Sequence, residues 1–485
     1  MDKHHGYTMT IDILPCNVLL EIFSFDVSPS DYNPWGWHRL VHVCRRWRQI
    51  IFASPLRLNL RVFCKTGTPV RKSLGIWPAI PICIEYGDIS SDDEDNIMAA
   101  LEHPDRLSDI RFLNMTGSQL GKVAAAMQGP SPILTCLKIV SKEGNVQVLP
   151  SGILGSAPRL REITLFRIPF PALPTLLLSA SDLVDLCLGS IPPTGYIPPD
   201  TMVAHLAVLS RLKTLRIGFQ VVPSHHDLIL SPPITRAVLP ALTHFTFSGV
   251  CEYSEDFVAR IDTPQLDTTS ILYGDHDIDF EVPQFSEFIN RSEKLKKTLS
   301  NNGVVMPDIY DGICFIIVSV TTSNQGRWDS NIGISICVTC GDKYQQILCL
   351  SNILRRISPI LPDLVHIQID SKLNLYESLS ESEGLGDIEW LQVLRTFPSV
   401  QTLFVCRTLA GQVCHALHDI DEELATQALP ALNLLCLEDQ PVASIVNFIA
   451  VRQDSGLPVT VVNDTLDNFA GRIDLYLMRQ GCVFL

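Results

Sequence analysis

The feature that most constrains the fold is a short apolar pattern that recurs along most of the chain. Each copy has an apolar residue, two variable residues, an apolar residue, one variable residue and a final apolar residue. The copies are LSDIRF, LTCLKI, LREITL, LVDLCL, LKTLRI, LTHFTF, LDTTSI, LVHIQI, VQTLFV and LNLLCL, which start at residues 107, 134, 160, 183, 212, 242, 266, 364, 400 and 432. Starts up to residue 266 lie 23–30 residues apart, so the pattern predicts one structural unit used repeatedly.

Each copy predicts a short strand with one buried face, because its last two apolar residues are two positions apart. The segments 118–128 and 200–212, which lie between copies, carry apolar residues at helical spacing. A strand–turn–helix unit of this length cannot bury its apolar side alone, so neighbouring units must stack. The predicted fold class is therefore α/β, with the repeats forming a solenoid.

This pattern resembles the leucine-rich repeat, whose strands line the concave side of a horseshoe. A regular repeat has Asn three residues after the last apolar residue, whereas the first copy here has Met115 and the third has Ile168. None of the ten copies has Asn there, so the hydrogen-bond ladder that Asn supplies is missing. We therefore expect an irregular leucine-rich-repeat-like α/β solenoid over residues 101–485. Within its long gap, FSEFINRSEKLKKTL predicts a helix, and ICFIIVSV and ISICVTC predict strands that continue the sheet.

The charge of the chain is unevenly distributed. There are 37 Lys and Arg against 52 Asp and Glu, a formal net charge of −15, yet residues 33–84 contain nine Lys or Arg and no Asp or Glu. The overall charge argues against nucleic acid or a membrane surface as a partner. No apolar run approaches the ~20 residues that span a bilayer. The fifteen cysteines are scattered singly, as expected of reduced thiols, so we expect a cytoplasmic or nuclear protein.

The basic island contains WHRLVHVCRRWRQII, residues 37–51, whose apolar residues recur at spacings of three and four and predict one amphipathic helix. Upstream, IDILPCNVLLEIFSF predicts a second helix that starts after Pro15. Two short helices cannot form a core by themselves, so they need a partner surface. The arginines around the apolar stripe are suited to docking on an acidic protein.

These two segments together resemble an F-box, which has a Leu-Pro opening, an apolar helix ending in Ile-Phe, and then Val-Cys-Arg-x-Trp. The resemblance covers about residues 12–53, with a connection at 26–37 that is longer than usual. SPLRLNLRVFC, WPAIPICI and DIEWLQVLRTFPSVQTLFV extend a resemblance to fungal F-box-like proteins with degenerate leucine-rich repeats. The expected domains are an F-box-like helical module at 1–53, a basic linker and acidic loop at 54–100, and the solenoid. The acidic loop is SSDDEDN, residues 90–96.

The resemblance implies a non-enzymatic adaptor that recruits substrates to an SCF-type cullin–RING ubiquitin ligase. Its F-box would dock on the Skp adaptor, and its repeats would bind a target protein that the sequence does not identify. The implied docking residues are Leu14, Pro15, Val18, Leu19, Ile22, Phe23, Val43, Cys44 and Trp47. The candidate target contacts, at outward strand positions, are Arg111, Lys138, Thr164, Cys187, Arg216, Thr246, Gln368 and Phe404. The alternative is a leucine-rich-repeat scaffold with a vestigial F-box, outside any ubiquitin ligase.

No motif predicts catalysis, a metal site or a cofactor. Cys337 and Cys340 form a CxxC, but no second pair follows at zinc-ligand spacing. His38 and His42 lie one helical turn apart without the Glu of a zincin motif, and the pair at 415 and 418 has the same limitation. A Gly-rich phosphate loop and a nucleophile elbow are also missing. We therefore expect a binding protein and no enzyme.

Overall fold

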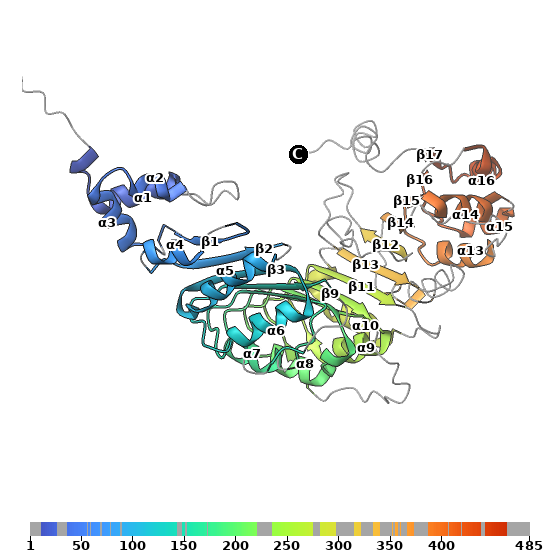
Figure 1. Ribbon diagram of the computed structural model, residues 1–485. Helices are drawn as coiled ribbons and strands as arrows, with labels where there is room; N and C mark the ends of the chain where they lie inside the picture. The colour runs from blue at the N-terminus through green and yellow to red at the C-terminus, as the bar shows by residue number, and fades with distance from the viewer. Residues whose placement is uncertain are drawn as a thin grey trace, which may run out of the picture. The chain divides into compact units, whose positions relative to one another are not determined.

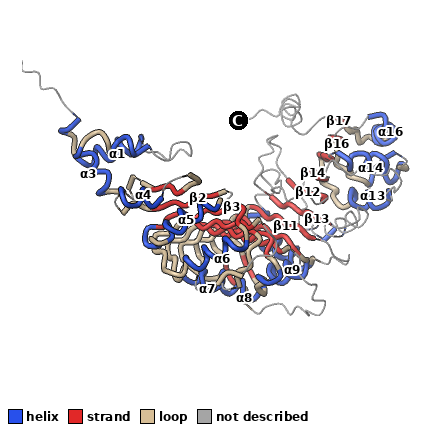
Figure 2. The backbone as a smooth tube through the Cα atoms, viewed as in Figure 1, coloured by secondary structure: helices blue, strands red, loops and turns tan. Residues whose placement is uncertain are grey.

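Parallel strands alternating with helices make up most of the chain in the computed structural model. The structure describes residues 11–26, 36–142, 148–220, 235–274, 282–296, 315–321, 333–339, 366–372 and 387–462, with short interruptions and a few isolated positions near 355. The chain divides into two units, Met1–Leu183 and Val184–Leu485. Each unit has strands with helices beside them (Figures 1 and 2).

The N-terminal region is helical, as predicted, but the helix predicted over residues 37–51 is broken in two. Its residues form α2 (Gly36–Val41) and α3 (Arg45–Ala53), which follow η1 (Ile11–Ile13) and α1 (Cys16–Asp26). The break arises because Cys44 is extended, with φ −155° and ψ 169°, and its Sγ accepts a hydrogen bond from the backbone N–H of Trp47 at 3.4 Å. Cys44 is therefore the N-cap of α3. The longer connection at 26–37 falls mostly on residues 27–35, outside the described residues.

In the first unit, five parallel strands lie in sequence order, and each pairs with the next. The strands are β1 (Val62–Cys64), β2 (Ile82–Tyr86), β3 (Leu107–Met115), β4 (Cys136–Ser141) and β5 (Glu162–Phe166). The helices beside them are α4 (Val70–Ile76), α5 (Ser91–Leu101), η2 (Pro104–Arg106), α6 (Gly117–Ala126) and α7 (Leu173–Ser179). The segment 54–100, expected as a linker and a loop, thus supplies two strands and two helices.

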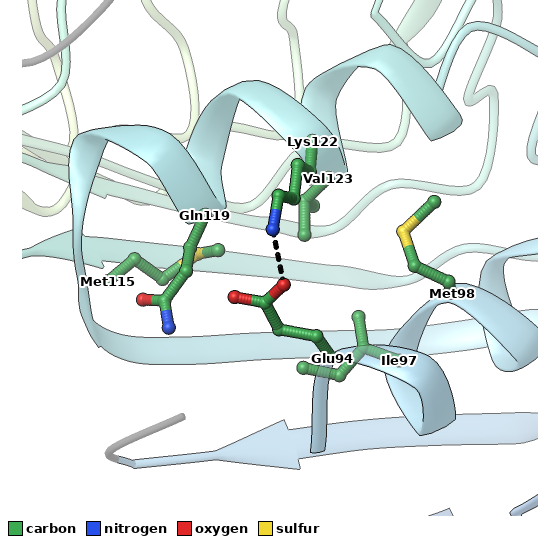
Figure 3. Close-up of a pocket in the computed structure, with 7 residues that line it drawn as sticks. All are labelled: Glu94, Ile97, Met98, Met115, Gln119, Lys122 and Val123. Atoms are coloured by element: carbon green, nitrogen blue, oxygen red, sulfur yellow. Dashed lines mark hydrogen bonds and ion pairs between the residues drawn. The ribbon is translucent and has the colours of Figure 1, made fainter. Parts of the chain in front are cut away.

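The acidic stretch 90–96 begins α5 instead of forming a loop. The Asp93 carboxylate accepts hydrogen bonds from the backbone N–H and the hydroxyl of Ser90, at 3.3 and 2.6 Å. This pairing caps the N-terminal end of the helix. Ile97 and Leu101 of the same helix are buried. Figure 3 shows how α5 packs on α6, with a cavity of about 10 Å³ between them, room for at most one water molecule. The acidic residues of α5 therefore begin an amphipathic helix, which the run of charges in the sequence does not indicate.

The second unit has ten strands in its larger sheet among the described residues. Their order is β6-β7-β9-β11-β13-β12-β14-β15-β16-β17. Their bounds are β6 (Asp185–Ile191), β7 (Thr214–Phe219), β9 (His244–Gly249), β11 (Thr268–Gly274), β13 (Gly333–Thr339), β12 (Phe315–Thr321), β14 (His366–Lys372), β15 (Thr402–Val405), β16 (Leu434–Leu437) and β17 (Thr460–Val462). Two short parallel strands, β8 (Ala237–Val238) and β10 (Ile261–Asp262), pair separately. The helices are η3 (Pro193–Gly195), α8 (Pro199–Leu206), α9 (Cys251–Ala259), α10 (Pro283–Arg291), α13 (Asp387–Arg395), α14 (Arg407–His418), α15 (Glu422–Gln427), η5 (Val442–Ile445) and α16 (Val446–Asp454).

All ten copies of the apolar pattern coincide with a strand, and the runs ICFIIVSV and ISICVTC form β12 and β13. The first apolar residue of a copy is buried, as at Leu160, Leu183 and Leu212. β12 departs from the parallel arrangement, since it is antiparallel to both β13 and β14. The connection at 322–332 is shorter than the dozen or more residues that a parallel crossover needs. The predicted class, mixed α/β with parallel strands after a helical N-terminal region, is confirmed.

Candidate functional site

The helices α1, α2 and α3 share one hydrophobic core with the first part of the sheet. The rings of Phe23 and Trp47 lie 4.6 Å apart between α1 and α3. The buried residues of this core are Leu19, Leu20, Phe23, Trp37, Leu40, Val41, Ile51, Leu58, Leu60, Val62 and Ile80. Because Val62 belongs to β1, the helical module and the first strand are packed as one body.

An aromatic cluster strengthens this junction. The ring of Trp77, which precedes β2, lies 5.1 Å from Trp37, 4.6 Å from His38 and 6.1 Å from Phe52, measured between centroids. The indole N–H of Trp37 also donates to the carbonyl of Arg61 at 3.3 Å. Burial in this cluster lowers the pKa of His38, and nearby His42 lowers it further. The helices are thus held against the start of the sheet.

We expect Trp77→Ala to weaken this junction by about 2 kcal/mol, because it removes the ring contacts of a half-buried side chain with Trp37, His38, His42 and Phe52. Hydrogen exchange measured by mass spectrometry should show faster exchange across α1–α3. Peptides from α13 and α14 in the second unit should exchange as in the wild-type chain. Unchanged exchange in the helices would show that Trp77 does not anchor them.

Two arginines of the basic island, the half-buried Arg46 and the exposed Arg48, connect parts of the module through hydrogen bonds. The Arg46 Nη2 donates to the carbonyl of Leu14 at 2.6 Å, which joins α3 to the turn before α1. The Arg48 Nε donates to the carbonyl of Val41 at 2.9 Å, at the C-terminal end of α2. Arg39 and Arg45 are exposed, so these two fit the predicted role as a charged rim.

The predicted docking residues fall into three groups by exposure. Pro15, Val18, Ile22 and Val43 are exposed, while Leu14, Cys44 and Trp47 are half-buried, and Leu19 and Phe23 are buried. Leu19 and Phe23 therefore pack the module against itself, and they cannot contact a partner in this conformation.

Phe25 is not among the predicted docking residues, yet its side chain is 82% exposed and lies near the end of α1. Val18, Ile22 and Phe25 follow one another at spacings of four and three, so they share one side of the helix. That spacing was visible in the sequence. We name these three residues the α1 stripe, and an exposed apolar strip of this kind is typical of a protein-binding surface.

The predicted target contacts lie in rows across neighbouring strands. In the first unit Arg111, Lys138 and Thr164 are register partners on β3, β4 and β5. In the second unit register partners are Cys187, Arg216 and Thr246 on β6, β7 and β9, and likewise Gln368 and Phe404 on β14 and β15. Arg111 and Arg216 are exposed, and the other described side chains of these rows are half-buried except that of Phe404.

Phe404 is fully buried, so its predicted contact with a target is wrong for this conformation. All four residues of β15 are buried, which means that both faces of this strand are covered. The prediction assumed that alternate strand positions face solvent, and that assumption fails at β15, where consecutive residues are all buried. The Gln368 side chain lies outside the described residues.

Only some of the residues considered for metal chemistry lie in the described part of the chain. Within the described part of the chain, no group of three or more His, Cys, Asp or Glu side chains is placed to hold a metal ion. Cys337 lies on β13, and Cys340 is outside the described residues. Burial raises the pKa of the Cys64 thiol to about 12, so it stays protonated and a poor nucleophile. None of the described helices combines the length and apolar character needed to cross a membrane.

Comparison with known proteins identifies the helical module. Residues 11–60 match the family model described as F-box-like, a range that covers η1, α1, α2 and α3. No curated protein matches the chain. An F-box-like domain supports a role in protein–protein interaction and points in general to a Skp-type adaptor as its partner. F-box proteins are generally non-enzymatic adaptors.

Proposed function

We propose that this chain is a substrate-recruiting subunit of an SCF-type cullin–RING ubiquitin ligase. The F-box-like module would dock on the Skp adaptor, and the strand-rich part, as an irregular leucine-rich-repeat-like solenoid, would bind the target protein. In this role the chain would act in the cytoplasm or the nucleus. The observation that carries the proposal is the F-box-like domain at 11–60, with apolar Val18, Ile22 and Phe25 exposed on its first helix.

The exposed apolar residues favour docking. Burying a Val, Ile or Phe side chain completely contributes about 1.5–3 kcal/mol. Val18, Ile22, Phe25 and Val43 are only partly exposed, so burying each in a complex would contribute a fraction of that amount. The exposed Arg39 and Arg45 on the neighbouring helices would orient the encounter with an acidic adaptor. Trp77 and the shared core would hold the docked module against β1, so the adaptor and the first unit would stay in one arrangement.

We expect Val18→Asp combined with Ile22→Asp to weaken binding of a purified Skp-type adaptor at least 100-fold. The double variant places two carboxylates on the α1 stripe, where they would be desolvated in the complex. Affinity is measured by titration calorimetry with the full chain. Both side chains are already exposed, so the fold should tolerate the change, which circular dichroism checks.

Leu178→Asp is the matched control, since Leu178 is an exposed apolar residue on α7, away from the F-box-like module. It should leave the adaptor affinity unchanged. Equal adaptor affinity of the double variant and the wild-type chain would refute docking through the α1 stripe. If the wild-type chain binds no adaptor at all, the alternative of a protein-interaction scaffold outside a ubiquitin ligase replaces this proposal.

A further inference from the structure

The outward face of the first unit's strands carries an organised set of charges. We call it the open face and define it by the register row Glu85, Arg111, Lys138 and Thr164, one residue from each of β2–β5. Glu85 and Arg111 are exposed, with side-chain accessibilities of 47% and 49%. The strand residues next to them point to the opposite face and are buried, as Ile110 on β3 shows. The open face is therefore accessible to another molecule.

Asp109 fixes the arginines of this face. Its carboxylate is buried. Arg61 Nη1 forms an ion pair with Oδ2, and Arg111 Nη2 donates a hydrogen bond to Oδ1 at 3.3 Å. One anion thus holds two guanidinium groups, which leaves them with a net positive charge. A guanidinium held in this way loses little conformational entropy when it binds a further carboxylate.

The thiols beside Asp109 add no charge. Cys83 and Cys136 are its register partners on β2 and β4. Burial raises the pKa of Cys83 to about 11 and that of Cys136 to about 12, so both remain neutral at physiological pH. Within the described residues Lys138 makes no ion pair, and its charge remains available on the open face.

The charge of the open face contrasts with that of the whole chain. With the charged residues that pair with this row or flank it, the cations are Arg61, Lys65, Arg111, Lys138 and Arg167, and the anions are Glu85, Asp109 and Glu162. The net charge of this set is 5 − 3 = +2, in a chain of net charge −15. Long-range attraction to a polyanion such as nucleic acid would be weak here, whereas local pairing with a few carboxylates is favourable.

Apolar side chains lie directly beside the charged row. Val140 and Phe166 are register partners on β4 and β5, both half-buried, and Leu113 on β3 is exposed. The Arg167 guanidinium lies over the Phe166 ring at 5.3 Å from its centroid. The surface thus offers cations and apolar contacts in neighbouring rows.

We propose that the open face binds an extended acidic segment of a target protein, with carboxylates on Arg111 and Lys138 and apolar side chains on Leu113, Val140 and Phe166. The inference rests on the proposed function, in which the strands hold a target, and it names the chemical class of that target. Lys138 is the contact residue to test. Arg111 is less suitable because it also pairs with the buried Asp109, so replacing it would disturb the fold as well.

The test is selection of a phage-displayed random peptide library on the immobilised full chain. Peptides of about 12 residues are long enough to cross four strands spaced ~4.8 Å apart. The selected peptides should be rich in Asp and Glu with interspersed apolar residues. Resynthesised peptides should bind Lys138→Glu about tenfold more weakly, as one lost carboxylate pairing predicts, while Lys138→Arg should restore affinity.

Lys72→Glu is the matched control, since Lys72 is an exposed lysine on α4, a helix outside the open face, and it should leave peptide affinity unchanged. Neutral or basic selected peptides, or peptides that bind Lys138→Glu as tightly as wild type, would overturn the inference. So would a single-stranded oligonucleotide that binds through Lys138 more tightly than the peptides.

Adaptor affinity separates this inference from the proposed function. Lys138→Glu should bind the Skp-type adaptor normally, because the α1 stripe is unchanged. If the adaptor does not bind the wild-type chain but acidic peptides do, the proposed ligase role is refuted and the inference that the open face binds acidic segments is supported. If the adaptor binds but the selection yields no acidic peptides, only the inference about the open face fails.

Discussion

Replacing Arg452 by Ala is expected to reduce the stability of the C-terminal part of the second unit by about 4 kcal/mol. Arg452 lies on α16 and is fully buried, and within the described residues it pairs with no carboxylate. Its Nη1 donates to the carbonyls of Ala425 and Ala428 at 3.1 and 3.3 Å. Its Nη2 donates to the carbonyl of Leu432 at 3.0 Å and lies 3.5 Å from the carbonyl oxygen of Pro430.

These carbonyls belong to the C-terminal end of α15 and the turn that leads into β16, where Leu429 has a positive φ of 52°. The guanidinium therefore satisfies acceptors that the turn leaves without partners, and its charge suits the negative end of the helix dipole. Burial lowers the pKa of Arg452, yet an arginine remains charged at physiological pH. Alanine would leave the carbonyls unsatisfied and open a cavity.

Hydrogen exchange measured by mass spectrometry checks this prediction. Protection of β16 and α15 should fall about a thousand-fold in Arg452→Ala, provided that exchange proceeds by unfolding of this region, while β3 and β4 keep theirs. Arg452→Lys should lose about half as much stability, because an ammonium group keeps the charge but cannot reach all the carbonyls. The control is Arg395→Ala at the exposed end of α13, with an expected loss below about 0.5 kcal/mol. Wild-type protection in Arg452→Ala would show that the carbonyls do not depend on this side chain.

The strands were predictable because their signal is local. A strand with one buried face repeats its apolar residues every two positions, and all ten copies of the pattern form strands. The stretch 90–96 was not predictable in the same way, since it reads as a solvated charge run. What makes it a helix is the pairing of Ser90 with Asp93 and the burial of Ile97 against the sheet.

The candidate site was predictable as a set of residues but not as a surface. α1 is apolar on two sides, so periodicity could not show that Phe23 faces the core while Ile22 faces solvent. The Cys44 cap likewise depends on a backbone conformation that the apolar spacing does not reveal. Arg452 and Glu255 were missed for another reason. Their partners are backbone groups 20–30 residues away, and backbone groups leave no signal in a sequence.

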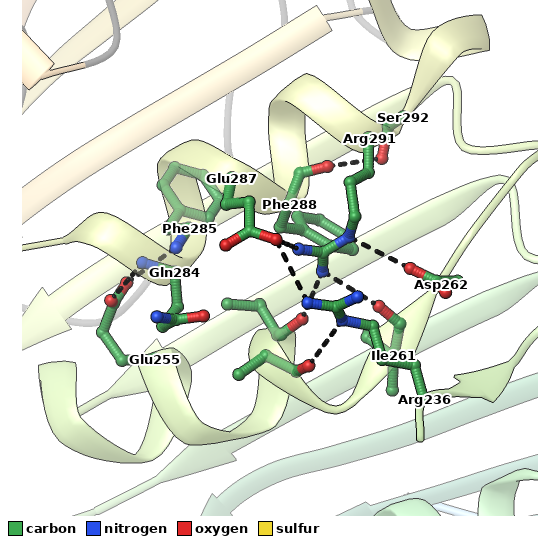
Figure 4. Close-up of polar contacts among 12 residues, drawn as sticks. Arg236, Glu255, Ile261, Asp262, Gln284, Phe285, Glu287, Phe288, Arg291 and Ser292 are labelled. Carbon is green, nitrogen blue, oxygen red and sulfur yellow. Dashed lines mark hydrogen bonds and ion pairs between the residues drawn. The ribbon is translucent and has the colours of Figure 1, made fainter. Parts of the chain in front are cut away.

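Glu255 should make the stability of the second unit depend on pH. It lies on α9, almost completely buried, and its carboxylate accepts hydrogen bonds from the backbone N–H groups of Gln284 and Phe285 at 2.7 and 2.9 Å (Figure 4). These bonds to the first turn of α10 favour the ionised form. Burial outweighs them and raises the pKa of Glu255 to about 7.

No charge compensates for this burial among the described neighbours. Figure 4 shows that the arginines at this contact are directed to Glu287 instead, with Arg236 Nη2 at 3.1 Å and Arg291 Nη1 at 2.8 Å from its Oε1. Cys251 on α9 and Tyr273 on β11 also face Glu255, but burial raises the pKa of each well above its usual value, so both are neutral. Glu255 is therefore an isolated carboxyl group in the core.

The direction of the pH effect follows from the two pKa values of Glu255. Between its ordinary pKa of 4.5 in the unfolded chain and about 7 in the folded chain, the folded state binds a proton that the unfolded state does not. This contribution to stability is fully present below pH 4.5 and is lost as the pH rises through 7. We expect the free energy of unfolding of the second unit to fall by about 3 kcal/mol across this window.

Urea unfolding from about pH 5 to about pH 8 measures this slope, and Glu255→Gln should flatten it because Gln does not titrate. The amide can still accept one of the two N–H groups, so the variant should fold, with lower stability than the wild-type chain at pH 5. Glu287→Gln is the matched control. It changes an exposed Glu at the same α9–α10 contact, whose carboxylate is paired with two arginines, so it shows what disturbing this contact does when Glu255 is left in place. A slope that persists unchanged in Glu255→Gln would assign the pH dependence to other groups, and it would mean that the amides of α10 hold this carboxylate ionised against its burial.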